Sequence, residues 1–149
     1  MMDARLVTIS SALAAALTAK DASGTPFSQR VKANFTFLPQ YEPADLVKPT
    51  LTILPRTKSC EVVSRDHKQS TTYTVDVALQ AKLDAFKDRD TQIKAWLALH
   101  EEIADFIAAL EVDPNIAWTG DDNVTPFLID HLLKGIFTGV LTVTYKEVR

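Results

Sequence analysis

Hydrophobic and polar positions along this chain repeat with two different periods, and the switches between them divide the sequence into predicted elements. In the N-terminal segment apolar residues recur every three or four positions, which predicts a helix over residues 3–19 with one apolar face. These apolar positions are Leu6, Ile9, Leu13 and Leu17. Asp3 is placed to cap the start of this helix, and Gly24 follows its end. Because polar residues interrupt the apolar run, the pattern favours a structural helix over a signal peptide.

The period then changes to two, which is typical of strands. Residues 31–37 alternate between apolar and polar side chains and predict a half-buried strand. The segment from Pro39 to Pro49 contains three prolines and predicts a surface loop. Residues 50–54 predict a strand inside the sheet, and we expect Pro55 to end it because proline lacks a backbone donor.

The strongest strand pattern covers residues 71–80, and a weaker one covers residues 60–65. The polar segment between them predicts a hairpin. Its tip brings Ser64, Asp66 and His67 close together in sequence, and these are the residue types of a hydrolase triad. Triad residues converge from separate elements, however, and the glycines of a nucleophile elbow do not flank this serine. The segment therefore predicts a charged hairpin tip.

The helical period returns in the second half of the chain and predicts a long helix over residues 91–110. Its apolar stripe is wide enough to cover a sheet face, with Leu99 and Phe106 on one flank. The stripe contains Ile93, Trp96, Leu97, His100, Ile103, Ile107 and Leu110. Asp90 or Thr91 is expected to cap the start of this helix.

The C-terminal part of the chain predicts a turn, a short helix and a strand. Residues 118–127 predict the turn, since adjacent Asp121 and Asp122 favour one. Residues 125–135 predict the short helix. Residues 136–149 alternate regularly and predict a long strand, whose threonine-rich second face lies either at solvent or against a neighbouring subunit.

Neither the histidines nor the paired aspartates form a metal-site pattern. His100 is followed by Glu101 and Glu102, but the zinc-protease pattern requires a second histidine where the chain has Ala104. We expect His100 to be a satisfied buried or boundary side chain. A calcium loop would need further oxygen ligands beyond two adjacent aspartates. No metal site is expected.

The composition indicates one globular domain. The chain has 149 residues, of which 46% are hydrophobic and 23% charged. A formal net charge of -3 argues against a nucleic-acid site built on phosphate neutralisation. Cys60 is the only cysteine, which excludes an intrachain disulfide. The order of elements predicts an α+β fold, with a mostly antiparallel or mixed β-sheet packed against an N-terminal helix and a long central helix.

The order and texture of these segments resemble the tail terminator proteins of tailed bacteriophages, also called tail completion or head–tail joining proteins. The segments that carry the resemblance are the helix at residues 3–19, PTLTILPR at residues 49–56, VVSRDHKQSTTYTVDVAL at residues 62–79, EEIADFIAAL at residues 101–110 and FTGVLTVTYKEVR at residues 137–149. The likeness covers nearly the whole chain. It rests on the order of segments, since the family has no catalytic motif.

The resemblance implies a structural role in the virion. Proteins of this family form a ring, typically hexameric, at the head-proximal end of the tail tube. The ring stops tube polymerisation and docks to the head–tail connector or stopper protein, while DNA passes through its bore without sequence-specific binding. The resemblance further implies assembly in the bacterial host cytoplasm, with no enzyme activity, no cofactor and no membrane partner.

A ring of small subunits needs protruding loops and strand edges that contact neighbours. We therefore expect subunit or partner contacts at the hairpin tip, at the loop around Tyr41 and Glu42, and at the edge of the C-terminal strand. The tip residues are Arg65, Asp66, His67 and Lys68.

Other interpretations stay open at this point. The first is a head-closure or stopper protein, or another neck or tube component of a phage particle. The second is an α+β binding module with no phage connection. The third is a small hydrolase that uses Ser64 or His67.

Overall fold

The computed structural model describes residues 4–29, 31–36, 49–62, 68–125 and 127–148 of the chain. Its elements follow one another as α1 (Arg5–Asp21), β1 (Lys32–Phe35), β2 (Thr50–Val62), β3 (Gln69–Lys82), α2 (Arg89–Ala109), β4 (Ile116–Thr125), α3 (Ile129–Leu133) and β5 (Ile136–Val148). The strands form a five-stranded sheet in the order β1-β2-β3-β5-β4. β1 pairs with β2 in parallel, and the other neighbours are antiparallel. The α+β fold with a mixed sheet is therefore confirmed.

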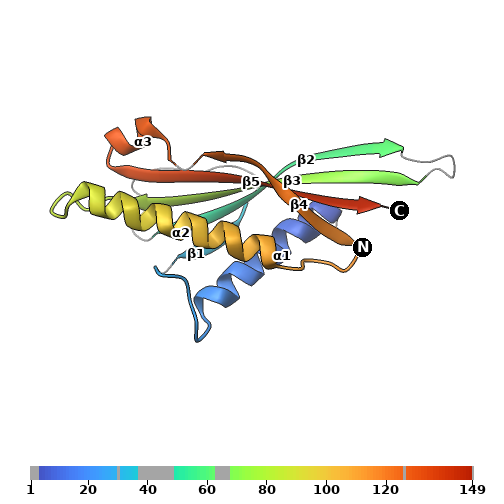
Figure 1. Ribbon diagram of the computed structural model, residues 1–149, viewed down its shortest axis with the longest axis horizontal. Helices are drawn as coiled ribbons and strands as arrows, with labels where there is room; N and C mark the ends of the chain where they lie inside the picture. The colour runs from blue at the N-terminus through green and yellow to red at the C-terminus, as the bar shows by residue number, and fades with distance from the viewer. Residues whose placement is uncertain (1–3, 30, 37–48, 63–67, 126, 149) are drawn as a thin grey trace.

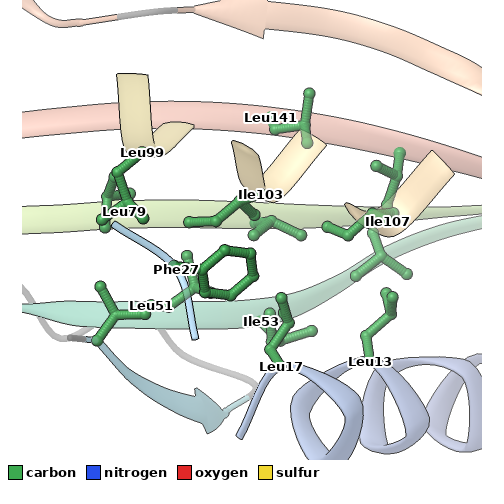
Figure 2. Close-up of a cluster of buried hydrophobic side chains, with 14 of the residues drawn as sticks. Leu13, Leu17, Phe27, Leu51, Ile53, Leu79, Leu99, Ile103, Ile107 and Leu141 are labelled. Carbon is green, nitrogen blue, oxygen red and sulfur yellow. The ribbon is translucent and has the colours of Figure 1, made fainter. Parts of the chain in front are cut away.

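The hydrophobic core lies between the sheet and the two long helices, which cover the same face of the sheet (Figure 1). Leu17 of α1 approaches Ile53 of β2 in this layer, and Ile103 and Ile107 of α2 lie above β3 (Figure 2). Burial of each such side chain contributes about 1.5–3 kcal/mol. The core therefore holds both helices against one face of the sheet.

The apolar stripe predicted for the N-terminal helix is confirmed. Its buried members are Ile9, Leu13 and Leu17. The helix begins at Arg5, and its N-cap is Ala4, which makes no side-chain capping hydrogen bond. Asp3, the expected cap, lies outside the described residues.

The long central helix is confirmed, but it begins earlier than expected. Asp88 is its N-cap, and the carboxylate accepts a hydrogen bond from the backbone N–H of Thr91 at 3.3 Å. The prediction of Asp90 or Thr91 as the cap is therefore wrong. Leu99, expected on a flank of the stripe, is fully buried, whereas Leu97 is only half-buried. Residues three and four positions apart lie on the same side of a helix, and Leu99 belongs to the set that is buried here.

β2 continues through Pro55, so the prediction that this proline ends the strand is wrong. The segment 50–54 and the described part of the segment 60–65, expected as separate strands, belong to one strand with a register shift between Pro55 and Thr57. β1 accompanies β2 only as far as Ile53 within the described residues. Proline is tolerated here because a bulge or an unpaired strand edge does not need the backbone N–H that proline lacks.

The segment 118–127, expected to be a turn, lies mostly in β4. Its pairing with β5 shifts register between Trp118 and Gly120 and again between Asp121 and Asn123. The two shifts break the alternation by which a strand is recognised in sequence, and Gly120 has a φ of 139°, which favours glycine. Because β4 is the outer strand, β5 lies inside the sheet. The prediction that the C-terminal strand offers a sheet edge is therefore wrong.

The strand predicted over residues 71–80 and the short helix predicted within residues 125–135 are confirmed as β3 and α3. The threonine-rich second face of β5 is less open than expected. Thr138 and Thr142 are only 3% and 2% exposed within the single chain. These two threonines therefore lie neither at solvent nor at a surface free for a neighbour.

Candidate subunit interface

The outer part of the β2–β3 hairpin projects beyond the two long helices (Figure 1). The seven residues Arg56–Val62 are all exposed, and so are Lys68 and Gln69 on the returning side. We call Arg56–Val62 together with Lys68–Ser70 the arm. The first half of the same strand, in contrast, buries Ile53 completely. One half of β2 therefore contributes to the core, and the other half contributes to the surface.

Among the residues expected to contact neighbours, Lys68 lies in the described part of the chain and is exposed on the arm. The others lie outside the described residues: Tyr41, Glu42, Arg65, Asp66 and His67. Val62 pairs with Gln69, which confirms the hairpin on which three of these residues lie in sequence. The structure therefore supports a hairpin here and leaves the contacts of its tip as a prediction.

The base of the arm is fixed to the sheet by a carboxylate. Arg56 lies at the register shift of β2, and its guanidinium is 3.4 Å from Asp76 Oδ1 on β3. The hydroxyl of Thr142 on β5 donates to the same oxygen at 2.6 Å. Asp76 thus joins three neighbouring strands where the arm leaves the body of the protein.

The two strands of the arm are also joined by side chains. Cys60 is exposed, and its thiol lies 3.2 Å from Oε1 of Gln69 across the hairpin. Cys60 also lies 3.7 Å from the hydroxyl of Thr71. A free thiol on an exposed strand offers a position for cross-linking to a partner.

A buried carboxylate lies beside the arm, on the residue of β5 that pairs with Thr71. Glu147 is 2% exposed, and its Oε2 is 3.5 Å from Nε of Arg5 at the start of α1. The hydroxyl of Tyr73 donates to Oε1 at 3.4 Å. This ion pair joins the N-terminal end of α1 to the end of β5. Sequence analysis missed it, although Glu147 occupies the same phase of the strand alternation as buried Tyr145.

The second half of α2 and the turn after it carry negative charge. Residues 95–113 contain no lysine or arginine. Their carboxylates are Glu101, Glu102, Asp105, Glu111 and Asp113. The last turn of α2 also lacks a basic residue, so the partial negative charge of a helix C-terminus adds to the same field. We call residues 101–113 the acidic segment.

A hollow of about 280 Å³ lies at the end of α2. It is lined by the apolar side chains of Leu110, Pro114 and Trp118 and by the carboxylates of Glu111 and Asp113. Apolar surface beside carboxylates suits a lysine, whose methylene stem packs while its ammonium group reaches an acid. The hollow therefore extends the acidic segment with a surface for an apolar or basic side chain.

His100 is buried as expected, with 7% exposure. Burial lowers the pKa of this imidazole below its usual value, although a hydrogen bond to the backbone of Val140 acts in the opposite direction. Its Nε2 has no hydrogen-bond partner among the described residues. The prediction of a buried histidine is confirmed, but only one of its two nitrogens is satisfied.

An imidazole–hydroxyl pair lies at the start of β5. Nδ1 of His131 is 2.7 Å from the hydroxyl of Thr138, which also accepts from Nε2 of Gln80 at 3.3 Å. A nucleophile must be reachable by its substrate. Thr138 is 3% exposed, so these bonds hold α3 against the sheet and do not create a hydrolase site.

Comparison of the chain with models of known protein families gave no match, and no curated protein matches it. Within the described ranges, no group of three or more His, Cys, Asp or Glu side chains could hold a metal ion. None of the described helices is long and apolar enough to span a membrane. Function is therefore inferred from the surfaces themselves.

Proposed function

We propose that this protein is a tail terminator of a tailed bacteriophage. In this proposal identical subunits form a hexameric ring on the head-proximal end of the tail tube. The ring ends tube polymerisation and joins the tail to the connector or stopper protein of the head.

The observation that carries the proposal is the arm. β2 has 13 residues, whereas strands in globular proteins usually have about 5–6. Its last seven residues, Arg56–Val62, are exposed and contribute nothing to the core of their own chain. A strand extended in this way is explained by contact with another molecule.

The architecture of the subunit supports the same proposal. A closed ring requires two different surfaces on each subunit, one for each neighbour. The arm and the acidic segment of α2 differ in shape and charge, so they meet this requirement. The net charge of -3 also suits a bore through which DNA slides, since dense lysine and arginine would hold the phosphates.

The test combines purified protein with tail tubes. Native mass spectrometry and negative-stain images are expected to give hexameric rings, located at tube ends when tubes are present. Capped tubes are expected to stop growing when more tube protein is added, and to join to tail-less heads. A protein that stays monomeric with tubes present, or tubes that continue to grow, would overturn the proposal.

The runner-up functions give different results in the same assay. A head-closure or stopper protein would bind tail-less heads and leave tube ends free. A binding module without a phage connection would bind neither. A hydrolase would turn over an ester, and Ser64→Ala or His67→Ala would each abolish that turnover. We expect the wild-type protein to show no ester turnover.

A further inference from the structure

The arm leaves part of the helix-covered sheet face without a helix. Lys58, Cys60 and Val62 are paired with β3 residues in the same phase of the alternation as its buried residues Tyr73 and Thr71. They therefore point to the face on which α1 and α2 pack. All three are exposed, and Val62 is 61% exposed. The same face is buried where α1 and α2 cover it. On the arm it lacks this cover within the described chain.

The arm also carries uncompensated positive charge. Lys58 and Lys68 are exposed, and no described carboxylate forms an ion pair with either. Lys146, on the neighbouring end of β5, is exposed as well. Arg56 is already engaged by Asp76. Glu61 is the one opposing charge among the described residues of the arm.

The acidic segment has the opposite imbalance. Glu101, Asp105 and Glu111 are exposed, and no described lysine or arginine forms an ion pair with them. The nearby Lys20 instead lies about 6 Å above the ring of Phe106. α2 packs on β5 within its own chain, while the arm extends away from it (Figure 1). The two oppositely charged surfaces therefore do not neutralise each other within one chain.

We propose that the arm of one copy docks across the acidic segment of a second copy. The second copy's α2 covers the bare face of the arm, with Lys58 beside the carboxylates of Glu101 and Asp105. Val62 packs near the hollow lined by Trp118, and Lys68 adds to the attraction. This contact rests on the proposed function and deepens it, because it names two surfaces by which successive subunits close the ring.

The contact is heterologous, since each copy offers its arm to one neighbour and its α2 to the other. Exposed ion pairs are individually weak and are screened by salt. The charges therefore set the orientation of the contact, and the covered strand face supplies apolar area. Self-association is expected to weaken as the salt concentration rises from about 0.1 M to about 1 M, where the screening length falls to about 3 Å.

Charge reversal tests the contact. The arm variant Lys58→Glu/Lys68→Glu and the helix variant Glu101→Lys/Asp105→Lys are each expected to weaken self-association by at least about tenfold, because like charges then face each other. Mixed in equal amounts, the two variants are expected to assemble again, since alternating copies restore opposite charges at every contact of an even-numbered ring. Native mass spectrometry then finds both chains in equal number.

A matched control and a chemical cross-link complete the test. Lys87→Glu/Lys134→Glu makes the same change in net charge at exposed positions, one in the turn before α2 and one at the C-cap of α3, and it is expected to leave assembly unchanged. In an Asp105→Cys variant treated with a mild thiol oxidant that accepts the two electrons, Cys60 of one copy is expected to form a disulfide with the new cysteine of the next. A ladder of linked chains then appears on a non-reducing gel.

The outcomes separate this contact from the proposed function. If both charge-reversed variants form rings as readily as the wild-type protein, the arm contact is excluded and the tail terminator proposal stands. Reversed variants that fail to recover on mixing would also overturn the contact. Loss of DNA binding in the arm variant with unchanged assembly would assign the arm to nucleic acid. A wild-type protein that never assembles would remove both proposals.

Discussion

Arg5 at the start of α1 and Glu147 near the end of β5 form an ion pair across the fold, with 3.5 Å between Nε and Oε2. Glu147 is 2% exposed, so its charge depends on protein partners and not on water. The pair fastens α1 to β5 at the level of Cys60 on the arm.

Replacing Arg5 with alanine is expected to reduce the free energy of unfolding by about 2–3 kcal/mol, because it removes a charged partner from a buried carboxylate. Denaturant unfolding measures the change. Lys134→Ala, at an exposed position, serves as the control and should change stability by less than about 0.5 kcal/mol. Equal effects of the two substitutions would show that the ion pair contributes nothing specific.

The two leucines of α2 offer a direct comparison of burial. Leu99→Ala is expected to cost about 2–5 kcal/mol of unfolding free energy, because Leu99 is fully buried and its loss leaves a cavity. Leu97→Ala removes the same atoms from a half-buried position and should cost less. Thermal and denaturant unfolding of both variants checks the order, and a larger loss for Leu97→Ala would contradict the placement of the helix face.

His100 gives a pH-dependent stability. Burial lowers the pKa of His100 in the folded protein below its ordinary value of 6.5. The unfolded chain then binds a proton that the folded chain does not, so this contribution to stability is complete above pH 6.5 and is lost as the pH falls below it. Unfolding free energies measured between about pH 7.5 and 5 should therefore decline. The decline should be smaller in a His100→Asn variant, and an equal slope in both proteins would contradict it.

The cap of α2 offers a test with a conservative control. Hydrogen bonds from the hydroxyl and the backbone of Thr91 lower the pKa of Asp88 below 3.8. Asp88→Ala removes the acceptor and is expected to lower the melting temperature, whereas Asp88→Asn retains a capping oxygen and should preserve most of it. The carboxylate contributes stability above pH 3.8 that is lost as the pH falls through its lowered pKa. Equal melting temperatures for the two variants would exclude the cap.

Periodicity predicted the elements that lie in regular surroundings. The stripes on α1 and α2 and the alternation of β3 identify their buried faces, because one continuous element packs on one continuous core. The α+β class follows from their order. Boundaries were less accurate, as at Asp88, where a loop aspartate and not a residue of the apolar repeat begins the helix.

Local irregularity explains what the sequence did not reveal. Pro55 predicts a strand end because a proline lacks a backbone donor, yet a bulge on an edge accommodates it. β4 was missed because two register shifts break its alternation. The error on β4 led directly to the error on β5, since the position of a strand in a sheet depends on all its neighbours.

The candidate interface was predicted only in part. A hairpin was expected at the right place, and Lys68 lies exposed on it. The acidic segment and the ion pair of Arg5 with Glu147 were missed. They depend on which side chains the fold leaves uncovered or brings together, and spacing along the chain does not encode that information.

The register shift between Pro55 and Thr57 has a consequence for how such a protein evolves. On its inner side, substitutions in β2 affect whether the chain folds; on its outer side, in the proposed contact, they affect whether a second copy binds. Two selective pressures thus act on separate halves of one strand. The outer half can diverge to follow a changing partner while the fold that presents it stays the same.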